Sequence, residues 1–297
     1  MTRSGGSILG MSHAGTPGID RLRAVVLGFA VGDALGAPFE DDSPTPEEIE
    51  GRLRGSETIR FTDDTYLVLS TMRALAEAGT PDWSSWLYWE ALRAGAVRAL
   101  VAWAASGDHR GVGDTTWAAI KQMTDHLERA RAPAAFELRT HGYDVERSAG
   151  NGILSRALPL VTLGVRGSPE LARFLALTHL HPKGHEVVDA MICAGSRQAA
   201  ANEESPPSGL GFYAPEALAI ATFAAAATTW EEAFRRSQVP DGDNDSTAAL
   251  ALGLWGLTHD AVESDSPLSQ LGRMAGADRS LIERACERVI TPPGACP

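Results

Sequence analysis

Apolar residues recur at spacings of three and four along most of the chain, whereas the alternation typical of half-buried strands is scarce. Alanine, the strongest helix former, is abundant throughout. Polar segments with glycine or proline separate the apolar stretches. The pattern predicts an all-α fold with helices over residues 21–37, 83–105, 115–130, 153–165, 169–178, 185–202, 215–227, 230–237 and 246–259, a helix after Asp64 that ends near Gly79, and two short helices near the end.

Residues 19–297 are expected to form one domain, because no stretch rich in proline, glycine and serine is long enough to divide the chain. Residues 1–18 contain no apolar run of signal-peptide length, and we expect them to be a disordered tail. Asp20 is predicted to cap the first helix. Residues 41–58 contain two prolines and should form a surface loop with at most one short helical turn.

The charge balance argues against one class of partner. The formal net charge is −12, with 38 acidic residues against 26 basic ones, whereas nucleic-acid-binding proteins carry clustered lysine and arginine. We therefore expect no binding to a nucleic-acid backbone. An anionic small molecule is still compatible with the sequence, since helix N-termini, backbone amides or bound cations can supply a local positive field.

The apolar stretches and the cysteines bear on location. The apolar stretch over residues 217–230 includes three threonines and is shorter than the roughly 20 residues that span a bilayer, so it predicts a buried helix. The three cysteines, Cys193, Cys286 and Cys296, fit neither a zinc motif nor a disulfide framework. We expect a cytoplasmic protein without membrane contacts, and a monomer.

Two acidic clusters directly precede apolar helices, and each combines two carboxylates with a hydroxyl: Thr62, Asp63 and Asp64, and Asp243, Asp245 and Ser246. The second cluster resembles the start of a calcium-binding EF-hand loop. Its sixth position is Ser246 and its twelfth is Leu252, however, where that loop needs glycine and a bidentate glutamate. Taken alone, each cluster is more often a helix cap worth about 1 kcal/mol.

The presence of two such clusters changes this interpretation. Four carboxylates brought together without cations would repel one another and their pKa values would rise. One or two hard divalent ions would neutralise them, and ligand sets made only of oxygen favour Mg²⁺, Mn²⁺ or Ca²⁺ over zinc. The sequence therefore predicts a metal site if the two clusters meet.

Glycine-containing segments and histidines add weaker signals. Asn151 lies between Gly150 and Gly152 ahead of a helix, where backbone amides can approach a phosphate, although the same pattern is also a common turn. Residues 111–116 are equally ambiguous. The three histidines within residues 179–185 have no cysteine nearby, so contact between a histidine and a substrate is preferred over zinc binding.

These motifs, in this order, resemble the ADP-ribosylglycohydrolase family, of the dinitrogenase reductase-activating glycohydrolase type. The matching segments are GFAVGDALGAPFE from Gly28, FTDDT from Phe61, GVGDTT from Gly111, GNGILSRALPL from Gly150, TH at Thr178 and WEEAFRRSQVPDGDNDSTAALALGLWGL from Trp230. TDDT and GDNDS are the specific parts. The resemblance runs from about Leu22 to about Leu257 and implies a compact, orthogonal multi-helix bundle whose cleft holds two Mg²⁺ or Mn²⁺ ions.

The resemblance also implies roles for individual residues. The metal ligands would be Thr62, Asp63, Asp64, Asp243, Asp245 and Ser246. The substrate-binding residues would be Gly113, Ser148, Gly150, Asn151, Gly152 and His179. The catalytic residues would be Glu40, Asp63, Asp64 and Asp245, with Glu40 placed over the metals.

The chain departs from the family pattern at three positions. Ser246 replaces a threonine and keeps the hydroxyl, so metal binding is expected to survive. Ser155 stands where a methionine is common. Gly111 stands where many arginine-specific members have an aspartate, and Asp108 or Asp114 is then the candidate contact for a leaving guanidinium.

The implied activity is metal-dependent release of ADP-ribose from a modified acceptor, first of all ADP-ribosyl-arginine on a protein. An ADP-ribosylated protein or a small-molecule substrate would be the partner. One alternative keeps this chemistry with serine, a nucleobase or O-acetyl-ADP-ribose as the acceptor. The others are a non-catalytic ADP-ribose binder and a metal-dependent nucleotide phosphohydrolase that uses the same carboxylates.

Overall fold

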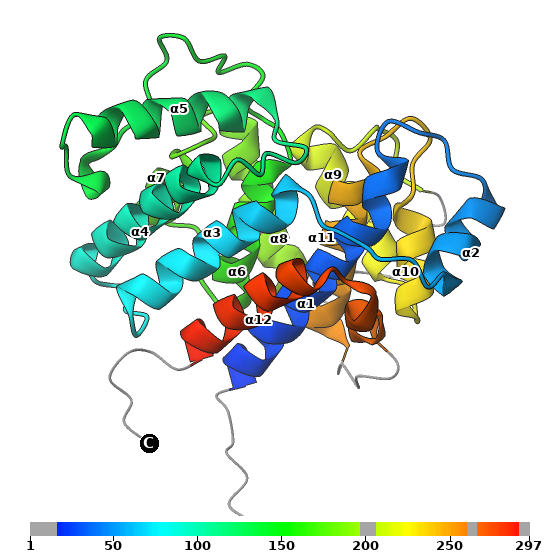
Figure 1. Cartoon of the computed structure of the whole chain (residues 1–297). Helices are drawn as coiled ribbons and strands as arrows, with labels where there is room; N and C mark the ends of the chain where they lie inside the picture. The colour runs from blue at the N-terminus through cyan, green and yellow to red at the C-terminus, as the bar shows by residue number, and fades with distance from the viewer. Residues whose placement is uncertain (1–16, 197–205, 260–265, 291–297) are drawn as a thin grey trace, which may run out of the picture.

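The computed structural model describes residues 17–196, 206–259 and 266–290, which are built from helices and contain no β-sheet (Figure 1). The all-α bundle predicted from the sequence is confirmed. The α-helices are α1 (Pro17–Gly36), α2 (Pro46–Arg54), α3 (Asp63–Ala78), α4 (Trp86–Ala105), α5 (Asp114–Glu128), α6 (Gly152–Thr162), α7 (Pro169–Leu175), α8 (Pro182–Ser196), α9 (Ala214–Ala225), α10 (Trp230–Ser237), α11 (Asn244–Thr258) and α12 (Gly276–Ile290). Short 3-10 helices are η1 (Ala37–Phe39), η2 (Pro133–Ala135) and η4 (Pro267–Arg273).

The centre of the molecule is the pair of helices α1 and α11, whose contact is more extensive than that of any other pair (Figure 1). Glycines on α1 let the two backbones approach closely: a Cβ at Gly28 would lie only 2.8 Å from the carbonyl oxygen of Leu252. Gly36 likewise faces the backbone of Asn244 and Asp245. This close packing places the second acidic cluster beside the end of α1.

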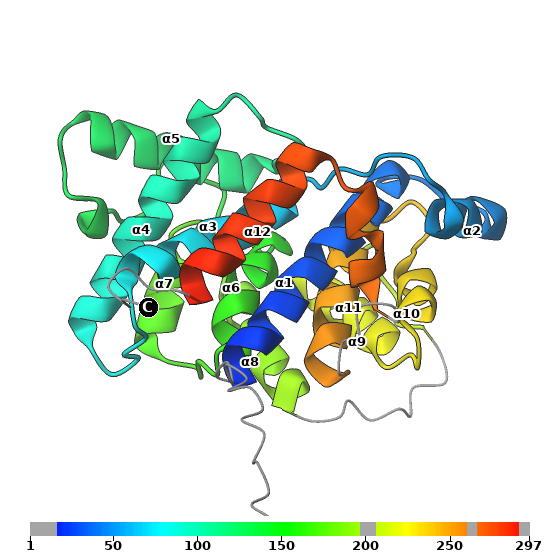
Figure 2. The same cartoon turned by 60° about the horizontal axis from the view of Figure 1, so that its bottom comes forward.

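The first acidic cluster reaches the same region through α3, which packs against α4, α6 and α12. Figure 2 shows α12 crossing the outer side of the bundle next to α1 and α3. Four helices, α3, α5, α6 and α11, begin close to one another and bring the loops before them together.

One segment that was predicted to be a loop contains a helix. Residues 46–54 form the nine-residue helix α2, because Thr45 and Glu48 make a complete capping box. The backbone N–H of Glu48 donates to Thr45 Oγ1 at 3.3 Å, and that of Thr45 donates to Glu48 Oε2 at 2.8 Å. The expectation of at most one helical turn there was wrong, although the Thr-x-x-Glu signal was present.

Several observed helix boundaries also differ from the predicted ones. Helix α1 begins at Pro17, so Asp20 lies in its first turn and does not cap it, and residues 17–18 are helical although the predicted tail included them. Residues 1–16 of the expected tail lie outside the described ranges, as do residues 197–202 of the helix expected over residues 185–202. Helix α4 begins at Trp86, three residues late, because Ser85 accepts a hydrogen bond from the Tyr88 amide at 3.3 Å. Helix α12 has 15 residues and is not short.

One helix, Asp20–Phe39, is long and apolar enough to cross a membrane by length and composition, with a mean hydropathy of 1.4. Within the fold, 78% of this apolar segment is buried. Packing against α11 accounts for its apolar character, so it fits a core helix.

Cys286 is buried and free, whereas Cys296 and the side chain of Cys193 lie outside what the structure describes.

Candidate functional site

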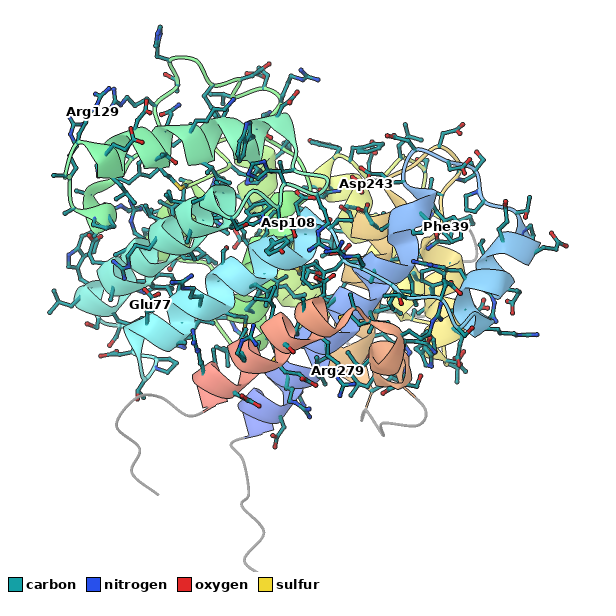
Figure 3. All side chains as sticks on the ribbon, in the orientation of Figure 1. Phe39, Glu77, Asp108, Arg129, Asp243 and Arg279 are labelled. Carbon is teal, nitrogen blue, oxygen red and sulfur yellow. The ribbon has the colours of Figure 1, made fainter. Side chains whose placement is uncertain are left out.

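A cavity of about 250 Å³ lies where the starts of α3, α5, α6 and α11 meet. It is lined by Glu40, Asp63, Asp64, Gly111, Gly113, Thr115, Thr116, Gly150, Asn151, Gly152, His179, Phe212, Asp243, Asp245 and Ser246. Figure 3 places Asp243 near the beginning of α3, whereas Glu77 lies at the far end of that helix. Because helix N-termini carry partial positive charge, their convergence favours anions in the cavity.

Three carboxylates from the two acidic clusters meet in this cavity: Asp64, Asp243 and Asp245 are each at most 6% exposed. One oxygen from each lies within 4.8 Å of the others. The clusters are far apart in the sequence, and the fold brings them together, which is the condition under which the sequence predicts a metal site. Such a set of buried oxygens fits a hard divalent cation.

Electrostatics supports the same conclusion. Burial, followed by the charge of Asp245, raises the pKa of Asp64 to about 6. Burial also raises the pKa of Asp63 and of Asp243, with Asp64 and Asp245 respectively as the largest neighbouring charges. Ionising these groups together without a cation is therefore costly, and the cluster has the chemistry of a metal-binding site.

Hydrogen bonds orient the carboxylates of the cluster. Ser246 Oγ donates to Asp64 Oδ2, and Ser155 Oγ donates to Asp64 Oδ1 at 2.5 Å. Asn151 Nδ2 donates to Asp243 Oδ2 at 2.8 Å and so links the predicted phosphate segment to the acidic cluster. Ser155, noted in the sequence only as a departure from the family pattern, thus has a defined role in holding Asp64.

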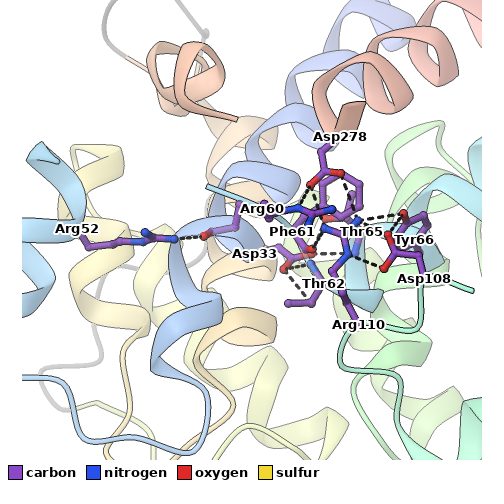
Figure 4. Close-up of polar contacts among 11 residues, drawn as sticks. Asp33, Arg52, Arg60, Phe61, Thr62, Thr65, Tyr66, Asp108, Arg110 and Asp278 are labelled. Atoms are coloured by element: carbon purple, nitrogen blue, oxygen red, sulfur yellow. Dashed lines mark hydrogen bonds and ion pairs between the residues drawn. The ribbon is translucent and has the colours of Figure 1, made fainter. Parts of the chain in front are cut away.

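Asp33, which the sequence analysis did not single out, organises the start of α3 (Figure 4). It is fully buried, and its carboxylate accepts from the backbone N–H groups of Thr62 at 2.8 Å and Thr65 at 3.0 Å. The two threonine hydroxyls lie within 2.9 Å of it. Burial and the charges of Asp245 and Asp64 raise the pKa of Asp33, and these hydrogen bonds oppose the rise. Asp33 is the one charged residue in the apolar stretch 24–39, and this was the signal that could have identified it.

Thr62 and Glu40 occupy different places at the site. The Thr62 side chain is buried beside the cluster, where its hydroxyl lies 3.1 Å from Asp245 Oδ2. Glu40 lies at the rim of the cavity, on a loop held by the hydrogen bond from Asp41 N–H to the Gly242 carbonyl at 3.0 Å. Partial burial, and then the charges of Asp245 and other nearby carboxylates, raise the pKa of Glu40 to about 7.

The predicted phosphate segment lines the cavity with Gly150, Asn151 and Gly152, beside His179. The predicted contact Ser148 does not line it. Its hydroxyl donates to the Val145 carbonyl at 2.6 Å and accepts from the amides of Leu180 and His181. Ser148 therefore holds the loop that carries His179. Gly113 lines the cavity as expected, whereas Thr115, Thr116 and Phe212 were not predicted.

The two aspartates proposed as contacts for a guanidinium lie elsewhere. Asp108 pairs with Arg110 through two hydrogen bonds of 2.7 Å, and Arg110 also donates to the buried Asp278 at 2.9 Å (Figure 4). Asp108 further accepts from the Tyr66 hydroxyl at 2.9 Å. Asp114 is exposed at the first turn of α5 and does not line the cavity. Asp108 is held by Arg110 and Tyr66, and Asp114 lies outside the lining of the cavity.

The chain is similar to known proteins in sequence and in fold. The model of the ADP-ribosylglycohydrolase family matches residues 15–207. A solved structure described as an ADP-ribosylglycohydrolase-related protein complex superposes with a TM-score of 0.62, at 21% sequence identity, over 92% of this chain and 98% of that one. At this identity the similarity concerns the fold. Among the curated proteins, none matches.

Proposed function

Because the chain belongs to the ADP-ribosylglycohydrolase family, we propose that it is a metal-dependent hydrolase that releases ADP-ribose from a modified acceptor. The observation that carries the proposal is the convergence of Asp64, Asp243 and Asp245 in one buried cluster beside the N-terminus of α6. A carboxylate cluster that can bind cations lies next to a helix N-terminus, which favours phosphate. This combination suits a ligand that has both ribose hydroxyls and a diphosphate.

Two divalent ions, Mg²⁺ or Mn²⁺, are the proposed cofactors. The residues that would hold them are Thr62, Asp63, Asp64, Asp243, Asp245 and Ser246. When bound, such ions supply Lewis-acid stabilisation of ribose hydroxyls and activation of water for attack at the ribose carbon C1. The buried carboxylates and hydroxyls supply only oxygen ligands, which supports hard cations over zinc.

Other residues of the chain would bind the substrate and transfer protons. Glu40 lines the cavity and belongs to neither acidic cluster, so it is the proposed acid or base. Asp63, Asp64, Asp243 and Asp245 would hold the metal ions in place. Gly150, Asn151 and Gly152 let a diphosphate approach the first turn of α6.

Arginine is the first acceptor to test. Since Asp108 and Asp114 do not line the cavity, Glu40 is the carboxylate outside the two acidic clusters that faces it. Glu40 is thus placed to meet a cationic leaving group, which supports arginine over a neutral acceptor. Serine, a nucleobase and O-acetyl-ADP-ribose stay as alternatives with the same chemistry.

The test is incubation with an ADP-ribosyl-arginine protein and, separately, an ADP-ribosyl-serine peptide, each with Mg²⁺ or with EDTA. We expect intact ADP-ribose to be released in a Mg²⁺-dependent way, fastest from arginine. Equal release by the double variant Asp63→Ala, Asp245→Ala would contradict the metal-site assignment. No release from either substrate would favour a non-catalytic ADP-ribose binder or another acceptor. Phosphate release from a nucleotide would favour the phosphohydrolase alternative.

The remaining expectations concern partners and location. An ADP-ribosylated protein or small molecule is the proposed partner, without nucleic-acid or membrane binding. The cytoplasmic location and the monomeric state stay predictions. Size-exclusion chromatography with light scattering tests the second of these.

A further inference from the structure

Arg156 is the largest side chain in the described ranges that is wholly removed from solvent. Its guanidinium forms no ion pair there, and burial lowers its pKa to about 9. It donates to the carbonyls of Phe174 at 2.9 Å and Leu175 at 3.2 Å in the last turn of α7, and lies 4.8 Å from the centre of the Phe174 ring. The negative end of α7 offsets part of the burial cost.

A third group contacts the same guanidinium on the cavity side. Arg156 Nη1 also donates to the hydroxyl of Thr178, and that oxygen lies 2.8 Å from His179 Nδ1. An arginine cannot accept a hydrogen bond, so the hydroxyl proton must be directed elsewhere. In the described part of the chain, His179 Nδ1 is the acceptor within reach of that proton. Nδ1 is then unprotonated, and a neutral His179 ring carries its hydrogen on Nε2.

The other edge of the His179 ring faces the cavity. His179 is 1% exposed and lines the cavity, and its Nε2 lies 3.6 Å from the position that a Cβ on Gly152 would occupy. No described residue forms a hydrogen bond with Nε2. Burial, followed by the charges of Arg156 and His185, lowers the pKa of His179 to about 3. The ring is therefore neutral near pH 7, with one N–H free to donate beside the first turn of α6.

We propose that Arg156, acting through Thr178, fixes His179 as the Nε2–H tautomer, so that this N–H donates to a phosphoryl oxygen of the ligand next to Gly150–Gly152. Arg156 and Thr178 are positioning residues, and His179 makes the contact. In the other tautomer, Nε2 would present a lone pair to an anionic oxygen and repel it. The phosphoryl contact rests on the proposed function, whereas the tautomer depends on the protein alone.

A purely structural role for Arg156 gives different expectations. If it only caps the C-terminus of α7, removing the Thr178 hydroxyl should change neither the tautomer of His179 nor the affinity for ligand. Thr178→Val removes the hydroxyl at nearly constant shape, and Thr178→Ser retains it. Thr162→Val is the matched control, because the Thr162 hydroxyl donates to the Leu158 carbonyl at 2.8 Å within α6 and is not part of the cavity.

The first arm of the experiment reads the tautomer directly. Protein labelled with ¹⁵N-histidine is studied between pH 6 and 8 by long-range ¹H–¹⁵N correlation spectra, with His179 assigned through His179→Gln. We expect the Nε2–H pattern in the wild type, Thr178→Ser and Thr162→Val. In Thr178→Val and Arg156→Met, an Nδ1–H population should appear. An Nδ1–H tautomer in the wild type, or no change in Thr178→Val, overturns the proposal.

The second arm measures ADP-ribose binding by calorimetry at saturating Mg²⁺. We expect about tenfold weaker binding for Thr178→Val, corresponding to about 1.4 kcal/mol for one oriented hydrogen bond, and wild-type affinity for Thr178→Ser. A wild type that does not bind ADP-ribose contradicts the proposed function, while the spectra still decide the tautomer. Unchanged affinity in Thr178→Val with an altered tautomer overturns the phosphoryl contact. If Arg156→Met does not fold, Thr178→Val alone decides whether the Thr178 hydroxyl fixes the tautomer of His179.

Discussion

Ser246 donates a hydrogen bond from its hydroxyl to the carboxylate of Asp64, which lies 182 residues earlier in the chain. Both side chains are almost fully buried, at 4% exposure each. The contact joins the start of α11 to the start of α3 at the centre of the acidic cluster. Together with the contact between Thr62 and Asp245, it links the two motifs that were singled out separately in the sequence.

Replacing Ser246 with alanine should weaken metal binding without unfolding the protein. The substitution removes one proposed oxygen ligand and the hydrogen bond that orients Asp64, and changes of this kind commonly cost 10- to 100-fold in metal affinity. Mn²⁺ titration followed by electron paramagnetic resonance measures the effect. Ser70→Ala is the control, since the Ser70 hydroxyl donates to the Leu67 carbonyl within α3 and does not line the cavity. Equal Mn²⁺ affinity in both variants would remove Ser246 from the ligand set.

The contribution of Asp64 to the stability of the metal-free protein should fall as the pH rises through the range from about 4 to about 6. His179, whose pKa is lowered to about 3, contributes in the opposite direction, so the Asp64 contribution is the difference between the wild type and Asp64→Asn. The pKa of Asp64 is raised by burial to about 6 in the folded state, so the folded state binds more protons than the unfolded state in this window. The loss amounts to up to about 3 kcal/mol for this group. Saturating Mg²⁺ should reverse the trend, because the cation stabilises the ionised carboxylates.

Thermal unfolding from pH 4.5 to 7.5, in EDTA and in Mg²⁺, measures this dependence. The variant Asp64→Asn cannot ionise at this position, so it should lack this fall in EDTA and should be stabilised little by Mg²⁺. Wild-type and Asp64→Asn curves that run parallel in EDTA over this range would contradict the assigned environment of Asp64.

Asp33→Asn should destabilise the fold and also disturb the site. Thr62 donates to Oδ1 of Asp33 and Thr65 donates to Oδ2. Asparagine replaces one of these oxygens with an NH2 group, which cannot accept, so at least one buried donor loses its partner. The cost is about 2–3 kcal/mol in the free energy of unfolding. Mn²⁺ affinity should fall as well, because the start of α3 carries Asp63 and Asp64.

Urea unfolding and Mn²⁺ titration test the Asp33 prediction together. Asp114→Asn is the matched control, since Asp114 is an exposed aspartate in the first turn of α5 and should change stability by less than about 0.5 kcal/mol. If Asp33→Asn and Asp114→Asn are equally mild, Asp33 does not organise the start of α3.

Gly111→Ala should reduce activity far more than Gly113→Ala, although both glycines line the cavity. Gly111 has a φ of +70°, and a Cβ there would lie 2.8 Å from Asp63 Oδ1. A Cβ on Gly113 meets nothing within 4 Å. The substitution at Gly111 costs about 1 kcal/mol in backbone strain and also displaces Asp63. Rates of ADP-ribose release and Mn²⁺ affinity for the two variants, compared at equal folded fraction, test this. Similar rates would show that Asp63 tolerates a shift.

The sequence by itself determined the helices and the two acidic clusters. Amphipathic spacing is a local property, so most helix boundaries fell within a few residues, and α10 (Trp230–Ser237) was predicted as it is observed. The sequence did not determine that the clusters meet, because repulsion among four carboxylates calls for a shared cation only once the fold brings them together.

Tertiary structure decided how the remaining polar groups are used. Asp33 reaches Thr62 across 29 residues, and Arg110, which pairs with Asp108, reaches Asp278 across 168. The hydroxyl of Ser148 holds the loop that carries His179. Arg156 contacts Thr178, the residue before His179, and has no carboxylate partner among the described residues. A side chain's partners depend on which surfaces pack together. Local spacing determines which residues can cap a helix or bind a metal, but burial and long-range contacts determine which of them are free to do so.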